Sequence, residues 1–301
     1  SGFKVIYYGE GVMPEADLYV YFDMPYPWRL NAWNKIIKNR EKNILFIFEP
    51  SIIQPFQYNR FFLSFFKEIH TYNDDIVDNK RFFKYYFPQN LRNINIKRNN
   101  FKNKRFLIFI NSNKFPLNPL NMISSFSNEK ELYSERQKAL DFFDQTIPNK
   151  FYLYGVGWNK PKRFNILEKM FGFKKYKSYK GPVDQNKKIK LLSEFKYSIC
   201  FENSTNNNGY ISEKIFDCFK AKCVPIYWGS SNVEKYIPKE CFIDYRKFMD
   251  YKKLLIFLQN ISEKEYNQYI SNINRFLRNK KTIDTWFEDG WVRSFTNKIL
   301  R

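Results

Sequence analysis

The segment Tyr197-Ser-Ile-Cys-Phe-Glu-Asn-Ser204 indicates how this chain folds, together with Gly209-Tyr-Ile-Ser-Glu-Lys214 and Val224-Pro-Ile-Tyr-Trp-Gly229. An apolar run gives way to a polar loop rich in Asn and Gly. An amphipathic stretch then begins at a serine, and a second apolar run ends at a glycine. This order predicts a buried strand, a loop, a capped helix and a second strand. The polar residues gather where strand gives way to helix, which is where open α/β sheets bind ligands.

The same alternation covers most of the chain and predicts doubly wound α/β architecture. The expected strands are Lys4–Tyr8, Leu18–Phe22, Ile44–Phe48, Phe106–Ile110, Phe151–Tyr154, Tyr197–Phe201 and Val224–Tyr227. The expected helices between them are Trp28–Asn39, Phe61–His70, Lys130–Phe143, Arg163–Phe171, Asn186–Phe195 and Ser212–Ala221. Beyond Asp250 the pattern predicts helices alone, over Tyr251–Gln259, Glu263–Leu277 and Thr285–Leu300.

A length of 301 residues is enough for two domains of ordinary size. The polar, basic stretch Asn93–Arg105 separates two α/β sets, so we expect an N-terminal domain over residues 1–100 and a C-terminal domain over 101–301. The longest apolar runs are too short to cross a bilayer, and the first residues show no signal-peptide pattern.

The formal net charge of +21 and the 20% of aromatic residues would suit a protein that binds single-stranded nucleic acid. The basic residues are, however, scattered along the chain among Asn and aromatic residues, as an AT-rich genome would produce. We therefore expect no specific nucleic-acid partner, while keeping the basic single-strand-binding protein as an alternative. The charge also suits an anionic nucleotide sugar or peripheral contact with an anionic membrane.

The cysteines and acidic residues argue against a metal site. Cys200, Cys218, Cys223 and Cys241 form no Cys-x-x-Cys pair, and the chain has a single histidine. No Asp-x-Asp motif occurs, although a hard cation needs several converging oxygens. We expect reduced, buried cysteines and a cytoplasmic location.

Ser212 is predicted to cap the helix over Ser212–Ala221, which places Glu213 and Lys214 in its first turn. Free backbone N–H groups and the helix dipole favour anions there, and Lys214 adds a cation. Glu213 can accept two hydrogen bonds from a ribose diol. The alternative is an ordinary capped helix with a solvated Glu-Lys pair.

Arg136 falls on the apolar stripe of the predicted helix Lys130–Phe143, four residues after Leu132. A buried guanidinium needs a partner, and a diphosphate held by two parallel hydrogen bonds would provide one. A nearby carboxylate is the alternative partner.

Glu49 ends the predicted strand Ile44–Phe48 and precedes Pro50. A carboxylate at the C-terminal end of a parallel strand points into the ligand cleft, and partial burial would raise its pKa toward a value suited to a general base. Glu10, in Gly9-Glu10-Gly11, is the rival candidate, and a solvated loop carboxylate is the alternative for both.

Five segments resemble the α-1,3-fucosyltransferases of glycosyltransferase family 10: Tyr133-Ser-Glu-Arg136, Phe151-Tyr-Leu-Tyr-Gly155, Gly157-Trp158, Phe201-Glu-Asn203 and Ser212-Glu-Lys214. The resemblance is strongest over residues 180–244, good over 132–158 and weak over the first 100. It implies a GT-B fold, with two doubly wound parallel-sheet domains facing a cleft and a helical C-terminus. The N-terminal domain would face the acceptor, and the C-terminal domain would bind the nucleotide sugar.

The resemblance also implies a reaction: inverting transfer of L-fucose from GDP-L-fucose to a GlcNAc- or glucose-type hydroxyl of a glycan, with an α-1,3 linkage and without a metal cofactor. The acceptor would be an oligosaccharide, or a lipid-linked or protein-linked glycan, as in lipopolysaccharide synthesis or protein glycosylation. A relative that binds GDP-sugar without catalysing transfer is a second alternative.

Site residues follow from the same resemblance. Glu49 would be the base, while Arg136 and Lys214 would hold the diphosphate and Glu213 the ribose. The remaining donor contacts would come from Glu202, Asn203 and Tyr210, with Lys180 or Lys187 as a further cation.

This chain departs from the family pattern at two places. Many relatives have a glycine just before the Val-Pro-Ile strand, where this chain has Lys222-Cys223. The loop Ser204–Gly209 is rich in Asn and slightly longer than in bacterial members.

Overall fold

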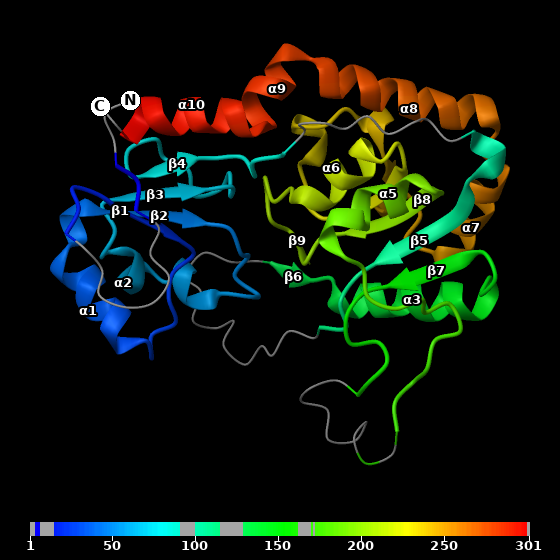
Figure 1. The fold of residues 1–301 in the computed structure, drawn as a ribbon, viewed down its shortest axis with the longest axis horizontal. Helices are drawn as coiled ribbons and strands as arrows, with labels where there is room; N and C mark the ends of the chain where they lie inside the picture. Colours follow the sequence, from blue (N-terminus) through cyan, green and yellow to red (C-terminus); the bar gives the residue numbers. More distant parts are fainter. Residues whose placement is uncertain are drawn as a thin grey trace.

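The computed structural model describes residues 4–6, 15–90, 100–114, 129–161, 170 and 172–299. It contains two parallel sheets (Figure 1). The first has the order β1-β2-β3-β4, formed by β1 (Tyr19–Phe22), β2 (Asn43–Ile47), β3 (Glu68–Thr71) and β4 (Phe82–Lys84). The second has the order β11-β10-β8-β5-β7, formed by β5 (Arg105–Ile110), β7 (Phe151–Tyr154), β8 (Phe195–Phe201), β10 (Val224–Trp228) and β11 (Ile243–Asp244). The predicted α/β class with parallel sheets is confirmed.

Helices flank both sheets. The helices of the N-terminal half are α1 (Leu30–Lys38) and α2 (Arg60–Leu63). Those of the second half are α3 (Tyr133–Thr146), α5 (Lys188–Ser193), α6 (Glu213–Lys220), α7 (Tyr251–Asn260), α8 (Glu263–Arg278), α9 (Lys280–Trp286) and α10 (Glu288–Ile299). A short antiparallel pair joins β6 (Lys130–Glu131) to β9 (Ser204–Thr205). The all-helical pattern predicted beyond Asp250 is confirmed.

Two predicted helices are wrong in part. The helix predicted over Lys130–Phe143 begins only at Tyr133, because Lys130–Glu131 pair with β9 as β6. The helix predicted over Phe61–His70 is wrong in its second half. Phe61–His70 has helical spacing of apolar residues, but α2 ends at Leu63 and β3 begins at Glu68. Ile69 is paired with Leu45 on one side and Phe82 on the other, so tertiary pairing overrides the local pattern.

Other predicted elements fall partly or wholly outside the described residues. Residues 4–6 of the first predicted strand are not in a strand, and residues 7 and 8 are not described. Also outside the described residues are Glu10, residues 93–99 of the predicted linker, and all but residue 170 of the predicted helix Arg163–Phe171.

Each sheet has its own hydrophobic cluster, and the last helix joins the first of them. The rings of Trp291 and Phe295 in α10 lie 5.6 and 5.5 Å from the ring of Phe46 in β2. Figure 1 shows α10 beside the first sheet. We retain a domain boundary near residue 100 as a proposal and assign α10 to the N-terminal unit on these contacts.

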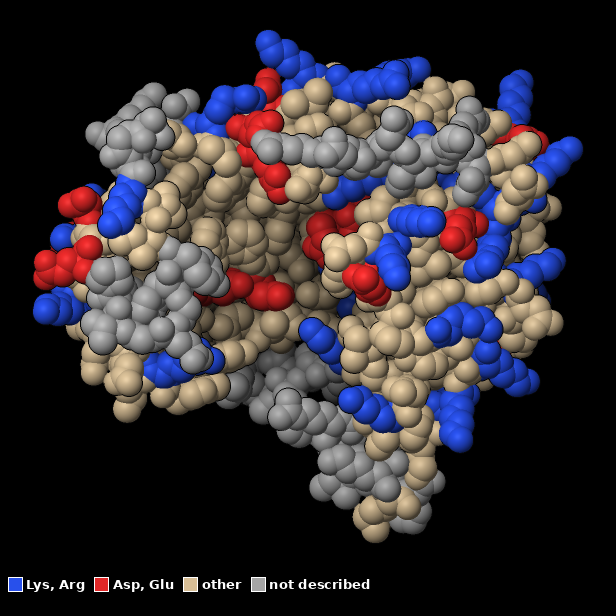
Figure 2. Space-filling model, in the orientation of Figure 1, with Lys and Arg blue, Asp and Glu red and all other residues tan. Residues whose placement is uncertain are grey.

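The two sheets present their C-terminal edges to each other. Figure 1 shows the arrows of β2 and β3 running toward those of β5 and β7. Figure 2 shows a hollow between the two halves, with Asp and Glu side chains inside it. The loops that follow the strands, where the predicted site residues lie, therefore meet at this hollow.

Gly155 permits a close approach between two of these loops. Its φ is +140°, and a Cβ there would lie 1.9 Å from the carbonyl oxygen of Asn111, which accepts a hydrogen bond from Trp158 Nε1 at 2.6 Å. Gly155→Ala should therefore lower the free energy of unfolding by at least roughly 3 kcal/mol in urea denaturation, through strain and overpacking together. Gly181→Ala is the matched control, because φ is +104° but nothing lies within 4 Å, and it should cost only roughly 1–2 kcal/mol. Equal losses in the two variants would contradict the role given to the Asn111 contact.

Candidate functional site

Glu202 directly follows β8, and its side chain is completely buried (0% exposed). Its Oε1 accepts a hydrogen bond from the Ser212 N–H at 2.9 Å, and its Oε2 accepts from Ser212 Oγ at 2.7 Å and from Lys214 Nζ at 3.0 Å. Every one of these donors belongs to the start of α6. Glu202 therefore fixes the end of β8 to the start of α6 and lies behind Lys214.

Ser212 caps α6, as predicted: its side chain accepts a hydrogen bond from the Lys214 N–H. Burial disfavours the charged form of Lys214, but Glu202 and Glu213 outweigh burial and raise its pKa. Glu213 lies at the exposed first turn of α6. Protein atoms packed around the Glu213 carboxylate keep water away and would raise its pKa. The charges of Lys214 and Lys188 outweigh this effect, so the pKa of Glu213 is lowered. The first turn of α6 thus presents a fixed cation and an ionised carboxylate.

Arg136, in α3, is 3% exposed. Its Nη2 donates to the carbonyl oxygen of Phe201 at 2.6 Å and to Asn203 Oδ1 at 3.0 Å, and its Nη1 donates to Asn111 Oδ1 at 3.4 Å. Its Nε has no hydrogen-bond partner within the described residues. Burial lowers the pKa of Arg136. The guanidinium is therefore a buried cation held by neutral oxygens, and no ion pair to a carboxylate is recorded for it in the described part of the chain.

Asn203 links Arg136 to Tyr210. Its Oδ1 accepts from Arg136, and its Nδ2 donates to the Tyr210 hydroxyl at 3.3 Å. The ring of Tyr210 is buried against Tyr72 and Phe87 of the N-terminal unit, with centroids 4.8 and 5.9 Å apart. Tyr210 therefore reaches the site by its hydroxyl, while its ring belongs to the domain junction.

A small cavity lies at the C-terminal ends of β5 and β8, where the sheet order predicts a ligand. Its polar lining includes Asn111, Lys188 and Lys214, and its apolar lining includes Phe109, Ile199 and Phe201. Lys188 also pairs with Asp217 Oδ2 at 2.8 Å. The cavity adjoins residues of both the Arg136 and the Glu202 networks.

Glu49 follows β2 and is half-buried, as predicted. Its N–H donates to Asp23 Oδ1 at 3.0 Å, and its carbonyl oxygen accepts from Gln57 Nε2 at 2.7 Å and from the Tyr58 hydroxyl at 3.0 Å. Burial and the neighbouring charge of Asp23 raise the pKa of the Glu49 carboxyl, while Lys214 acts in the opposite direction. Lys214 and Glu213 both act on that pKa, which indicates that Glu49 lies near the start of α6.

Four further residues belong to the site and were not predicted from the sequence: Asp23, Asn111, Lys114 and Lys188. Asp23 follows β1 as Glu49 follows β2, so the same strand-end argument could have found it. Asn111 likewise follows β5. Lys114 acts on the pKa of Glu49 but lies in a polar run without a motif.

Other predicted features have mixed outcomes. Lys180 is exposed, with Nζ 5.7 Å from the ring of Tyr152, and no recorded hydrogen bond or ion pair within the described residues joins it to Arg136 or Lys214. Its donor role stays a prediction. All four cysteines are free and buried, as predicted.

Two searches of the described residues found nothing. No group of three or more His, Cys, Asp or Glu side chains there could hold a metal ion. No helix there is long and apolar enough to cross a membrane.

Known proteins are similar in sequence to the second half of the chain. Residues 157–288 match the family described as glycosyltransferase family 10 (fucosyltransferase) C-term. Alpha-(1,3)-fucosyltransferase FucT of Helicobacter pylori is 32% identical over 95 residues, which are 32% of this chain and 20% of that protein. Vertebrate relatives are matched over 24–34% of their length. The chain thus spans about a third or less of these relatives.

Solved structures share the fold over nearly the whole chain. An alpha1,3-fucosyltransferase with GDP-fucose has a TM-score of 0.52 at 17% identity and covers 96% of this chain and 79% of its own. An alpha-glucosyltransferase in complex with UDP and a 13-mer DNA has a TM-score of 0.60 at 10% identity and covers 95% and 80%. The fold is therefore that of the GT-B glycosyltransferases, and residues 157–288 are similar to the C-terminal domain of glycosyltransferase family 10, the fucosyltransferase family.

Proposed function

We propose that this protein transfers L-fucose from GDP-L-fucose to a GlcNAc- or glucose-type hydroxyl of a glycan, with inversion and an α-1,3 linkage. The observation that carries the proposal is Arg136, a buried cation without a carboxylate partner among the described residues, placed beside Lys214 at the end of β8. A diphosphate supplies the charge that such a site lacks. The name of the Helicobacter pylori relative and the GDP-fucose in the similar solved structure support the donor and the linkage.

In this proposal the diphosphate lies between Arg136, Lys214 and the free N–H groups at the start of α6. Glu213, ionised in the first turn, binds the ribose hydroxyls, and Asn203 with the Tyr210 hydroxyl orients the sugar and phosphate. Negative charge grows on the diphosphate as the bond to fucose breaks. Cations already fixed in place stabilise that charge without reorganising. Because Arg136 and Lys214 supply this charge, we propose transfer without a metal ion.

Glu49 lies across the hollow from these cations. A half-buried carboxylate with a raised pKa can take the proton of the acceptor hydroxyl as that oxygen attacks the anomeric carbon. Attack from the side opposite the diphosphate inverts the configuration. The side chains of Asp23, Gln57 and Tyr58 hydrogen-bond the backbone of Glu49 and hold this end of the strand in place. The proposed base is thus held in position before the acceptor binds.

The test is a GDP-release assay with GDP-L-fucose and a panel of N-acetyllactosamine, lactose and GlcNAc, with and without EDTA. We expect acceptor-dependent release that EDTA leaves unchanged. GDP binding without release would instead identify a relative that does not catalyse transfer. No GDP binding, together with tight binding to a single-stranded oligonucleotide, would favour the basic nucleic-acid-binding alternative.

The phosphate contacts can be tested with GDP and guanosine in parallel. Lys214→Ala and Arg136→Ala should each weaken GDP binding roughly 10–100-fold, because a hydrogen bond to a charged group contributes about 1.5–3 kcal/mol. Guanosine lacks the phosphates, so its affinity should change little, which separates a lost contact from misfolding. Lys138→Ala is the control, since Lys138 is an exposed lysine of α3 that pairs with Glu135 at 2.6 Å. Calorimetry that finds wild-type GDP affinity in both variants would disprove the assignment.

Glu49→Gln should keep the fold and the GDP affinity but lower kcat roughly 10²–10⁴-fold, the usual contribution of a general base. The reason is that a base acts on the acceptor in the transition state and leaves the donor's ground-state contacts alone. Glu10→Gln, measured in the same way, should have a much smaller effect. If Glu10→Gln abolishes transfer and Glu49→Gln does not, the base belongs to the Gly9-Glu10-Gly11 loop.

Asp23 should control the pH dependence through Glu49. A general base works when deprotonated, so the acidic limb of kcat/KM against pH follows the pKa of Glu49. The nearby charge of Asp23 raises that pKa, and Asp23→Asn should therefore move the acidic limb to lower pH. The asparagine oxygen can still accept the N–H groups of Phe48 and Glu49. A limb that stays in place or moves to higher pH would contradict this pairing.

A further inference from the structure

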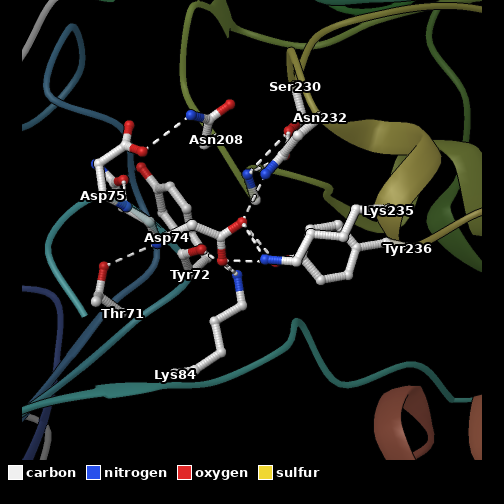
Figure 3. A network of polar contacts seen from close by, with 12 residues as sticks. Thr71, Tyr72, Asp74, Asp75, Lys84, Asn208, Ser230, Asn232, Lys235 and Tyr236 are labelled. Atoms are coloured by element: carbon white, nitrogen blue, oxygen red, sulfur yellow. Dashed lines mark hydrogen bonds and ion pairs between the residues drawn. The ribbon is translucent and has the colours of Figure 1, made fainter. Parts of the chain in front are cut away.

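The loop after β3 meets the C-terminal domain through Asp74 (Figure 3). Its carboxylate accepts a hydrogen bond from Asn232 Nδ2 at 2.7 Å and another from the Tyr236 hydroxyl at 2.6 Å. Lys84 Nζ, from β4, donates to it at 2.8 Å. Lys235 Nζ is 3.7 Å away. The hydrogen bonds from Lys84 and Tyr236 outweigh burial and lower the pKa of Asp74. One carboxylate thus collects donors from both domains.

The Asn-rich loop completes this contact from the other side. The Asp74 N–H donates to the carbonyl oxygen of Asn208 at 3.0 Å, and Asn208 Nδ2 donates to Asp75 Oδ1 at 2.9 Å. The Gly209 N–H donates to Asn232 Oδ1 at 2.9 Å. Asn232 therefore uses one end of its amide for each domain. We call Asp74, Asn207, Asn208, Gly209 and Asn232 the interdomain clasp.

Gly209 sets how closely the domains approach. Its φ is +85°, and a Cβ there would lie 2.3 Å from the carbonyl oxygen of Tyr72. Only glycine accommodates both the conformation and the contact. The backbone of Gly209 thus packs directly against the backbone of Tyr72, and this contact sets the distance between their two loops.

A directed series of hydrogen bonds runs from the clasp to Glu49. Asn207 Nδ2 donates to the Tyr72 hydroxyl at 3.2 Å and also to Glu129 Oε1 at 2.9 Å. The Tyr72 and Tyr58 hydroxyls lie 2.5 Å apart, and the Tyr58 hydroxyl donates to the Glu49 carbonyl oxygen at 3.0 Å. Burial raises the pKa of both tyrosines well above the usual value, so both hydroxyls keep their protons and each can donate once. The backbone of Glu49 is therefore tied to a loop of the other domain.

The clasp is continuous with the donor side of the site. Asn203, which contacts Arg136, lies four residues before Asn207 of the clasp. Ser212, which caps α6, lies three residues after Gly209 of the clasp. A single short segment thus carries contacts of the donor cations and contacts that hold the opposite domain. The Asn207 and Asn208 side chains of this loop make these contacts.

We propose that Asp74, Asn207 and Asn232 are positioning residues that fix the separation between Glu49 and the donor cations. The effect on catalysis rests on the function proposed above, whereas the effect on the domain arrangement does not. If the clasp sets the separation, breaking it should lower kcat and leave the affinity for GDP, bound by one domain, nearly unchanged.

The test exchanges the two central side chains. Asp74→Asn leaves an oxygen for Lys84 and Tyr236 but sets an N–H group against Asn232 Nδ2, and Asn232→Asp places two carboxylates against each other. Each should lower kcat at least tenfold with GDP affinity within twofold of wild type. The double variant Asp74→Asn/Asn232→Asp restores one carboxylate–amide pair and should recover kcat to within about threefold. Asp75→Asn is the matched control, because its oxygen can still accept from Asn208.

A second measurement does not depend on activity. Cysteines introduced at the exposed positions Ile37 in α1 and Ile256 in α7 can carry nitroxide labels, since the four native cysteines are buried. Pulsed EPR should give one narrow distance distribution for the otherwise wild-type protein, a broader one for Asp74→Asn, and a narrow one again for the exchange variant. Wild-type distances and kcat in Asp74→Asn, with or without a lower Tm, would overturn the proposal. Broadened distances in a protein that transfers no fucose would support the clasp and reject the proposed reaction.

Discussion

The buried carboxylate of Glu202 is the interaction on which the rest of the site depends. A carboxyl group that is fully removed from water needs hydrogen-bonding or charged partners, and all the recorded partners of the Glu202 side chain come from Ser212 and Lys214 at the start of α6. Gly229, at the end of β10, leaves room for it, because a Cβ there would lie 2.4 Å from Glu202 Cγ. The strand end, the helix cap and the glycine after the next strand therefore form one unit, and the direction of the α6 axis and the position of Lys214 follow from it.

Arg136 and Lys214, the two cations that we propose bind the donor, differ in how their charge is balanced. Lys214 faces Glu202 at 3.0 Å, so much of its charge is already compensated inside the protein. Arg136 is more deeply buried and receives only neutral oxygens from Phe201, Asn203 and Asn111. An anionic ligand would therefore stabilise Arg136 more than Lys214. Lys214, already paired with Glu202, would mainly help to orient that ligand. The Nε of Arg136, which has no partner within the described residues, is consistent with a site whose hydrogen bonds are completed by that ligand.

Much of this arrangement could be predicted from sequence where chemistry is local. The strand, cap and helix around Ser212 follow from apolar runs and capping preference, and Glu49 follows from the end of an apolar run. Non-local features were missed. β3 looked helical because Phe61, Phe65 and Ile69 are spaced like a helix face, while its pairing with β2 and β4 has no local signal. Nothing in the loop residues Asn207 and Asn208 indicated partners more than a hundred positions away. The packing of α10 against the first sheet likewise depends on tertiary contacts that have no local sequence signal.

The way the chain crosses between the domains explains why the clasp matters for separation more than for folding. The segment leaving the first sheet and the segment between α9 and α10 are hydrogen-bonded side by side, from the Gln89 N–H to the Trp286 carbonyl oxygen at 2.6 Å and from the Glu288 N–H to the Gln89 carbonyl oxygen at 3.3 Å. Paired crossings resist separation of the domains but permit rotation about them. Tyr236 lies beside these crossings, in contact with Trp286, whereas Asn207 contacts Tyr72 and Glu129. Asn207 therefore supplies an attachment separate from the crossings and from Tyr236, and several separate attachments fix the angle between the domains where the crossings alone would leave it free. Through Tyr72 and Tyr58 the Asn207 attachment reaches the backbone of Glu49, so the same hydrogen bonds that fix the angle also hold Glu49.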